Sequence, residues 1–259
     1  MNKLPASTGW LWIKQGFALF RKQPGGLSTL FLGYMFVMIF LSLLPVLGQF
    51  VPLMLVPVFS IAFMRACVDI EQNKRITPLL LLSGFRKPAF TPLFALGTLY
   101  LAAAAAAVAV STLADDGMLA KFLMGRIEPD AQALKDANLS GAILLALAVY
   151  VPAAMAFCFA APLIYWQQMG LGKAIFFSFF AVLRALRAFI TFALGWFGIV
   201  MGVSVIVVLI LGTSELATTL MVPVSVVLTV VLNCSLYASY RQIFGVPPQP
   251  DTETPAAPL

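Results

Sequence analysis

Six long stretches of predominantly apolar residues dominate this sequence. Crossing roughly 30 Å of hydrocarbon takes about 20 helical residues, so each stretch is long enough to span a bilayer. Only 10% of the 259 residues are charged and 61% are hydrophobic, whereas a soluble domain carries charge on roughly a quarter of its residues. So few charges cannot cover a water-exposed surface, and we expect lipid to be the main solvent. The expected spans are residues 27–47, 51–70, 89–112, 139–166, 189–211 and 216–240.

The connections between these stretches predict three helical hairpins. Gly48-Gln49-Phe50 is all that joins the first two spans, which favours a tight turn. The fourth span is long enough to tilt or to extend past the membrane, and Pro152 and Pro162 are candidates to interrupt it, although isolated prolines are tolerated in bundles. The expected fold is therefore all-α, a polytopic membrane helix bundle of about six transmembrane helices.

Basic residues favour one orientation of this bundle. If the N-terminus lies in the cytoplasm, only Lys121, Arg126 and Lys135 of the 16 lysines and arginines face outward. Cytoplasmic loops of membrane proteins are enriched in these residues, so both termini are predicted to be cytoplasmic. The net charge of +6 is then explained by orientation against anionic headgroups. No basic stripe with interleaved aromatic residues lies on a soluble segment, which argues against a nucleic-acid partner.

A short amphipathic helix is predicted before each hairpin, at residues 8–22, 76–85 and 172–187. Tryptophan together with basic residues suits a helix lying at headgroup level. The alternative is that these segments are extensions of the neighbouring spans. The residues expected to face lipid or headgroups are Trp10, Trp12, Lys14, Arg21, Lys22, Arg86, Lys87, Arg184 and Arg187.

A weak internal repeat accompanies this layout. The odd-numbered spans follow basic clusters, and the even-numbered spans contain Val-Pro pairs and end near a glutamine: Gln72, Gln168 and Gln242. Three copies of a two-helix hairpin would produce this pattern. Chance similarity is the alternative, because Val-Pro and Leu-Arg pairs are common in membrane proteins.

Residues 1–245 are expected to form a single membrane domain. Its one sizeable outer loop is predicted at residues 114–138. The tail at residues 246–259 is rich in proline and lacks apolar periodicity. Such composition is typical of disorder, and we expect this tail in the cytoplasm.

The sequence offers few groups for catalysis or metal binding. It contains no histidine, and Cys67, Cys158 and Cys234 are far apart, so common zinc, haem and Ser-His or Cys-His sites are not expected. We therefore predict no enzymatic activity, no metal and no cofactor.

Arg65 and Asp69 form the one candidate polar pair within a predicted span. They are four residues apart on one helix face, and ionisable groups at membrane depth are often functional. The alternative is structural: both lie within about two turns of the span's end, so Arg65 can extend to the headgroups.

The chain contains three distinctive motifs: Gly9-Trp10-Leu11-Trp12-Ile13-Lys14-Gln15-Gly16-Phe17, Phe20-Arg21-Lys22-Gln23-Pro24 and Ser83-Gly84-Phe85-Arg86-Lys87-Pro88. They resemble those of a family of proteobacterial inner-membrane proteins of unknown activity. More distantly, the plan of interfacial helix plus hairpin is similar to the membrane domains attached to some bacterial glycerophosphodiester phosphodiesterases. The closer resemblance extends over nearly the whole chain and implies an inner-membrane location. Neither resemblance implies a catalytic site among these residues.

The resulting functional hypothesis is a non-enzymatic inner-membrane protein that organises lipid or a partner through its basic inner surface. The expected partners are anionic lipid headgroups, with a protein partner or a homo-oligomer also possible. The alternative hypothesis is a small-solute transporter or channel component, suggested by the proline-containing spans and by the Arg65 and Asp69 pair.

Overall fold

The computed structural model describes residues 4–45, 48, 50–115, 117–123, 139–212 and 214–248. Six helical segments in this part of the chain are long and apolar enough to cross a membrane, which confirms the all-α prediction of six spans. The predicted outer loop falls mostly outside the described residues, as does most of the proline-rich tail. The spans are α2 (Pro24–Ser42), α3 (Val51–Glu71), α4 (Phe90–Asp115), α7 with α8 (Leu139–Phe157 and Ala160–Gln167), α10 (Leu186–Leu211) and α11 (Glu215–Phe244).

Helix boundaries follow ordinary local signals. Proline stands at the start of α2, α3 and η2 (Pro78–Phe85), where its missing N–H would have no partner in the helix. The Ser214 hydroxyl accepts a hydrogen bond from the Ala217 amide and caps α11. Gly212 ends α10 with a φ of +65°, a conformation that glycine adopts at little cost. These signals place the turn between the last two spans close to its predicted position.

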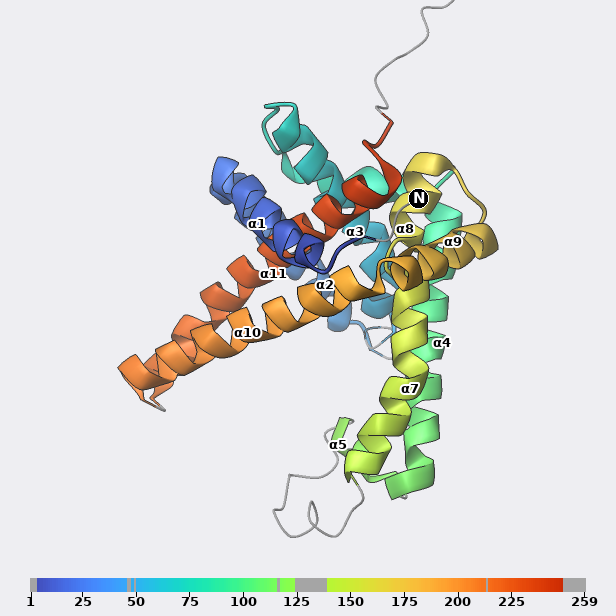
Figure 1. Ribbon diagram of the computed structural model, residues 1–259, viewed down its shortest axis with the longest axis vertical. Helices are drawn as coiled ribbons and strands as arrows, with labels where there is room; N and C mark the ends of the chain where they lie inside the picture. The colour runs from blue at the N-terminus through green and yellow to red at the C-terminus, as the bar shows by residue number, and fades with distance from the viewer. Residues whose placement is uncertain are drawn as a thin grey trace, which may run out of the picture.

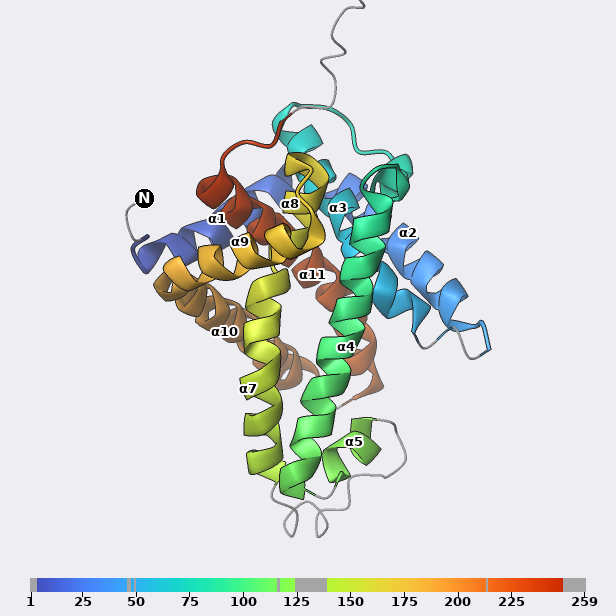
Figure 2. The ribbon, with the colours of Figure 1, turned by 90° about the vertical axis from the view of Figure 1, so that its right-hand side faces the viewer.

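The three hairpins diverge from a common end like the legs of a tripod (Figures 1 and 2). Helices α2 and α3 form one leg, α4 and α7 the second, and α10 and α11 the third. At the common end lie α1 (Ser7–Lys22), η2, α8 and α9 (Leu171–Arg184). The short α5 (Met118–Leu123) lies at the opposite tip of the second leg. We call the common end the basic end, for the charges described below.

Each short segment at the basic end packs mainly on one of the three hairpins. The 3-10 helix η2 packs mainly on α3, and α9 packs on α7 and α8. The segment α1 packs instead on α10 and α11, the third hairpin. The predicted three-unit layout thus has a spatial counterpart, but η2 and α9 cover the hairpin before them in the chain, and α1 covers the third hairpin.

Small residues allow α1 to lie directly on the last hairpin. The backbone at Gly9 contacts α10 so closely that a Cβ there would be 2.1 Å from the Ala188 carbonyl oxygen. A Cβ at Gly16 would be 2.0 Å from the Ser235 Oγ of α11. Trp12, between these glycines, is 0% exposed, and its Nε1 donates a hydrogen bond to Gln242 Oε1 at 2.6 Å. The prediction that Trp12 faces lipid is therefore wrong, because the close approach of the helices buries it in protein.

The protein core lies around α3. We define the membrane window of a span as its 18-residue apolar stretch. In α3, 56% of this window is buried inside the protein, against 11–22% in the other spans. Its fully buried residues pack with side chains from α8 and α11, so the legs are joined near the basic end and separate beyond it. The buried residues of α3 include Val58, Ile61, Ala62, Ala66 and Cys67.

The fourth span is interrupted, as the sequence suggested. Helix α7 ends at Phe157 and α8 begins at Ala160, in the turn before Pro162, whose ring excludes the carbonyl four residues earlier from the helix. Ser178 of α9 fills the gap: its hydroxyl donates to the Met155 carbonyl and accepts from the Phe159 amide, both at 2.9 Å. A side chain from another helix thereby replaces one backbone hydrogen bond. Pro152, by contrast, stays within α7.

Candidate functional site

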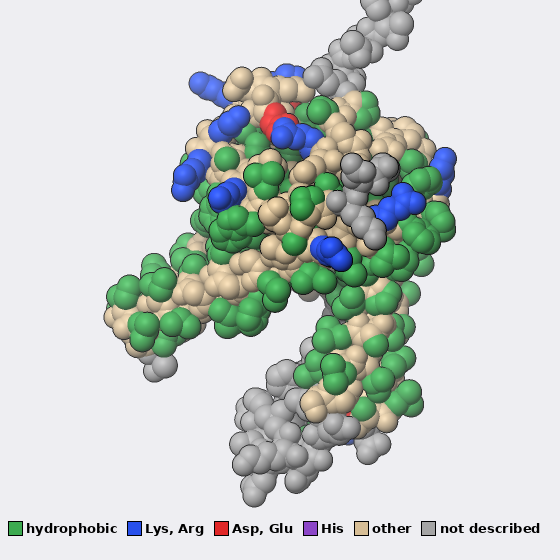
Figure 3. Space-filling model, viewed as in Figure 1, with side chains coloured by type: hydrophobic (Ala, Val, Ile, Leu, Met, Phe, Trp, Pro, Cys, Tyr) green, Lys and Arg blue, Asp and Glu red, His purple; other side chains and the backbone are tan. Residues whose placement is uncertain are grey.

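The described lysines and arginines lie at the basic end, with the exception of Lys121 on α5 (Figure 3). Most of them are exposed and occupy α1, the connections on either side of η2, α9 and the first turn of α10. We call this exposed set the basic rim. Its members are Lys14, Arg21, Lys22, Lys74, Arg75, Arg86, Lys87, Lys173, Arg184 and Arg187.

Exposed apolar side chains accompany the basic rim on each of the three short segments. Trp10 and Leu11 of α1 are 45% and 44% exposed. Leu79 and Leu82 are exposed on η2, and three phenylalanines are exposed on α9: Phe176, Phe177 and Phe180. The Lys173 ammonium lies 5.9 Å from the centroid of the Phe177 ring. Segments α1 and α9 therefore have one face on protein and another that combines cations with large apolar groups, the composition of a helix at headgroup level. In η2 the exposed leucines lie between basic connections.

Small residues form the protein-facing sides of the other two segments as well. On α9, Ala174, Ser178 and Val182 recur every four residues and are buried. At Gly84 of η2, a Cβ would be 2.2 Å from the Val58 carbonyl oxygen of α3. Both segments are thus held close to their hairpins, and the exposed apolar residues named above lie on their other sides.

A polar contact joins α3 to α11 at the basic end. Glu71 forms an ion pair with Arg241, and its second carboxylate oxygen accepts a hydrogen bond from the Tyr237 hydroxyl at 2.8 Å. Deeper in the same contact, the buried Cys67 and Cys234 sulfurs are 3.6 Å apart. Sequence reasoning missed this contact. Its signal was an acid at the end of the second span and an arginine at the end of the sixth.

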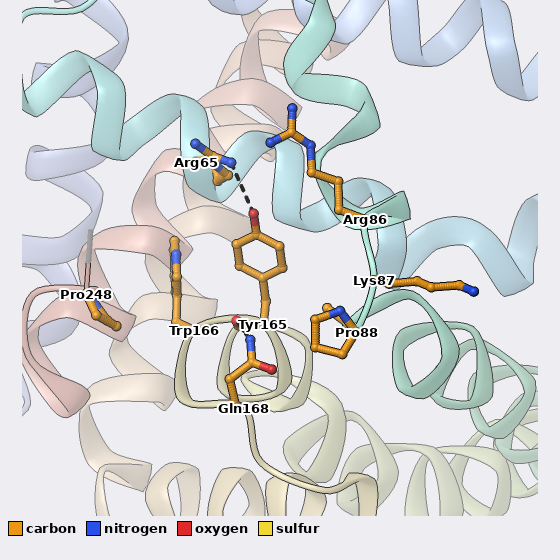
Figure 4. A pocket seen from close by; sticks show the side chains of 9 residues that line it. Arg65, Arg86, Lys87, Pro88, Tyr165, Trp166, Gln168 and Pro248 are labelled. Atoms are coloured by element: carbon orange, nitrogen blue, oxygen red, sulfur yellow. Dashed lines mark hydrogen bonds between the residues drawn. The ribbon is translucent and has the colours of Figure 1, made fainter. Parts of the chain in front are cut away.

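A pocket of about 310 Å³ opens at the basic end between α3, α8 and the connection from η2 to α4. The Arg65 guanidinium, half-buried, donates a hydrogen bond to the Tyr165 hydroxyl at 3.1 Å (Figure 4). The Arg65 side chain of the predicted polar pair is thus directed toward Tyr165 of α8. Asp69, also half-buried, is not among the residues that line this pocket: Arg65, Arg86, Lys87, Pro88, Ala89, Tyr165, Trp166, Gln168 and Pro248.

The structure brings some predicted site residues together and separates others. Arg86 and Lys87 share the pocket with Arg65, although they lie far from it in sequence. Arg21 and Lys22 lie on α1, and Arg184 and Arg187 lie at the junction of α9 with α10, at other places on the rim. Within the described residues, no group of three or more His, Cys, Asp or Glu side chains could hold a metal ion.

The six spans, the diverging hairpins and the segments at one end define a polytopic helical membrane protein. The chain is 40% identical over 254 residues to a probable inner membrane protein of Burkholderia thailandensis, and the match covers 94% of this chain and 93% of that protein. The chain therefore belongs to the same family of inner membrane proteins. No family model matches the chain, and no solved structure matches it.

Proposed function

We propose that this protein organises anionic phospholipids at the cytoplasmic face of the inner membrane and catalyses no reaction. The observation that carries the proposal is the basic rim with its exposed apolar residues, gathered at one end of the molecule. Each cation near an anionic surface contributes about 1 kcal/mol. Apolar side chains inserted beside these cations contribute further, by roughly 25 cal/mol for each Å² removed from water.

The shape of the molecule supports a role that involves many lipids. Segments α1, η2 and α9 surround the basic end and would occupy area in one leaflet only. The legs diverge toward the other leaflet, and for most spans only 11–22% of the membrane window is buried in protein. Lipid would therefore fill the space between the legs, while the rim holds anionic headgroups around them. This collar of lipid, held by the basic rim around the protein, would be enriched in anionic lipid without a closed binding site.

The proposal requires the basic end to face the cytoplasm. A reporter active only in the cytoplasm should work when fused after Arg75, Lys173 or Gly245. The same reporter should be silent when fused within residues 120–133. The reversed pattern at two or more of these points would contradict both the orientation and the six-span topology.

Lipid enrichment tests the proposal directly. The full-length protein, extracted with its surrounding lipid by a polymer that forms native nanodiscs, should carry more phosphatidylglycerol than the bulk membrane. The test variant replaces five rim residues by glutamine: Lys14, Arg21, Lys22, Arg184 and Arg187. It should lower this enrichment several-fold, because each lost cation removes about 1 kcal/mol of attraction, roughly a factor of five, for the headgroup beside it.

Lys121→Gln is the matched control, since Lys121 lies on α5 at the opposite tip of a leg. It should leave the lipid composition unchanged. Equal enrichment in the wild type and the five-residue variant would contradict the proposal.

The alternative, a small-solute transporter or channel component, remains a prediction from the sequence. A transporter usually has convergent polar groups near the middle of the membrane, whereas the pocket with Arg65 and Tyr165 lies at the basic end. The distant similarity to membrane domains of glycerophosphodiester phosphodiesterases also remains a sequence-based expectation. A protein partner or a homo-oligomer would use the same exposed surfaces, and neither is required by the lipid proposal.

A further inference from the structure

We infer that the pocket between α3, α8 and the η2 to α4 connection is a specific site for the phosphate group of an anionic ligand. The position of the pocket favours an anionic phospholipid headgroup as the source of that phosphate. This inference deepens the proposed function and rests on it for the lipid source. It concerns one defined site, whereas the basic rim as a whole gathers lipid loosely.

The arrangement of donors is the first reason. Arg65 and Arg86 come from separate elements and extend to the same side of the Tyr165 ring, whereas Lys87 points away (Figure 4). A guanidinium presents five N–H donors in a planar fork that matches two phosphate oxygens. The Tyr165 hydroxyl accepts a hydrogen bond from Arg65, so its own proton remains available to a ligand. Three donor groups thus surround one space.

The charge in the pocket is the second reason. Two guanidinium groups, those of Arg65 and Arg86, extend to the space beside the Tyr165 hydroxyl, and the described residues that line the pocket include no acid. Like charges held in one pocket repel one another, and an anion between them removes that repulsion. Arg65 is half-buried beside Trp166, which is 9% exposed, so its charge is less screened by water than the rim cations are. A bound phosphate would therefore gain more from Arg65 than from an exposed lysine.

The depth and size of the pocket favour a lipid headgroup. Arg65 stands six residues before the end of α3, which places it about 9 Å along the helix at 1.5 Å per residue. That depth corresponds to the headgroup region of a membrane that ends near Glu71. A volume of about 310 Å³ holds a phosphate with glycerol and some water, and no acyl chains. The chains would remain outside, among the apolar spans.

Native mass spectrometry of the full-length protein in detergent tests the inference. Short-chain phosphatidylglycerol is titrated, with phosphatidylcholine as the control lipid because its choline cation opposes the arginines. We expect one tight phosphatidylglycerol adduct. Arg65→Gln and Arg86→Gln should each weaken it roughly tenfold, since a lost charge-assisted hydrogen bond is worth about one decade in affinity. Arg65→Lys should also weaken it, because lysine keeps the charge and loses the planar fork.

Lys87→Gln is the matched control within the same connection, and it should change the affinity less than threefold. Arg86→Gln alters an exposed residue, so a folding defect there is not expected. Thermal unfolding of each variant identifies any that fail to fold. Tyr165→Phe keeps the ring and should weaken binding less than either arginine variant.

Inorganic phosphate and glycerol 3-phosphate separate the two possible sources. If millimolar concentrations of either displace the lipid, the site takes soluble phosphate esters, and phosphate recognition stands without the lipid source. If neither displaces it, the lipid source is supported. Equal binding to wild type, Arg65→Gln and Arg86→Gln would overturn the inference. A single adduct that survives in the five-residue rim variant would support the pocket even if the collar of lipid fails its own test.

Discussion

Helices α3 and α10 are both apolar spans, yet their surroundings are opposite. The mean hydropathy is 2.0 for the α3 window and 2.7 for the α10 window, while the buried share is 56% and 11%. The less hydrophobic helix is therefore the one buried in protein. Lipid tails solvate a leucine as well as another leucine does, so hydrophobicity does not drive helices together inside a membrane. Close packing of small residues and polar contacts drive them together, and α3 has both.

The glycines make this difference concrete. Gly97 of α4 lies so close to α3 that a Cβ there would be 1.8 Å from the Met54 carbonyl oxygen. Gly198 and Gly202 of α10 have no atom within 4 Å of the position that a Cβ would take. Glycine thus permits a helix contact in one place and serves no contact within this chain in the other.

The largest expected effect comes from Gly97→Ala. The added methyl group would force α3 and α4 apart, and overpacking of this kind costs about 3 kcal/mol. Thermal unfolding in detergent should show a lower midpoint and reduced yield. Gly198→Ala, the control on α10, should be neutral or slightly stabilising, because alanine favours a helix by up to about 1 kcal/mol over glycine. Similar losses for the two variants would refute the contrast between the helices.

An intermediate effect is expected from Glu71→Gln. The change removes the ion pair with Arg241 and leaves a weaker acceptor for the Tyr237 hydroxyl. Hydrogen bonds to charged groups contribute about 1.5–3 kcal/mol. Because the Arg241 side chain is 38% exposed, solvent screening reduces this to roughly 1–2 kcal/mol.

A double-mutant cycle with Arg241→Gln, read by thermal unfolding, should give a coupling of that size. Glu215→Gln is the control, since Glu215 is exposed in the first turn of α11 at the far end. Additive losses for Glu71 and Arg241 would show that the pair does not fasten α3 to α11.

A smaller and more local effect is expected from Ser178→Ala. The change removes the hydroxyl that occupies the break between α7 and α8, leaving the Phe159 amide without that acceptor, at a cost of about 1 kcal/mol. Amide hydrogen exchange should become faster at residues 159–161 and along α9, with little change in the rest of the protein. Ser225→Ala on α11 is the control, because Ser225 is exposed and its hydroxyl donates only to the Val222 carbonyl. Unchanged exchange around Phe159 would argue against this role of Ser178.

The sequence predicted those features that depend on residues close together in the chain. Span positions follow from apolar length, and the break in the fourth span follows from Pro162. The face that α1 turns to the protein was predicted less well. Trp10 and Trp12 were both expected to face lipid, but the buried side carries Trp12, Ile13 and Leu19 together with two glycines.

The pocket could not be located from the sequence for a different reason. Arg65, Arg86 and Lys87 each stood out as basic residues near span ends. Tyr165 is polar, but neither hydropathy nor periodicity indicates that α8 brings it to Arg65. That contact joins residues 100 positions apart, and it depends on the break that lets α8 leave the axis of α7. Basic composition therefore predicted the rim as a whole, and tertiary packing was needed to define one site on it.

The packing of α1 on the third hairpin has a consequence for biosynthesis. Segment α1 is synthesised more than 160 residues before the helices on which it packs, α10 and α11, are complete. Until then Gly9, Trp12 and Gly16 have no protein surface to cover them. A chain that stalls before α10 and α11 are made would thus leave the glycine-containing face of α1 without the helices that it contacts. Docking of α1 therefore requires the synthesis of α10 and α11.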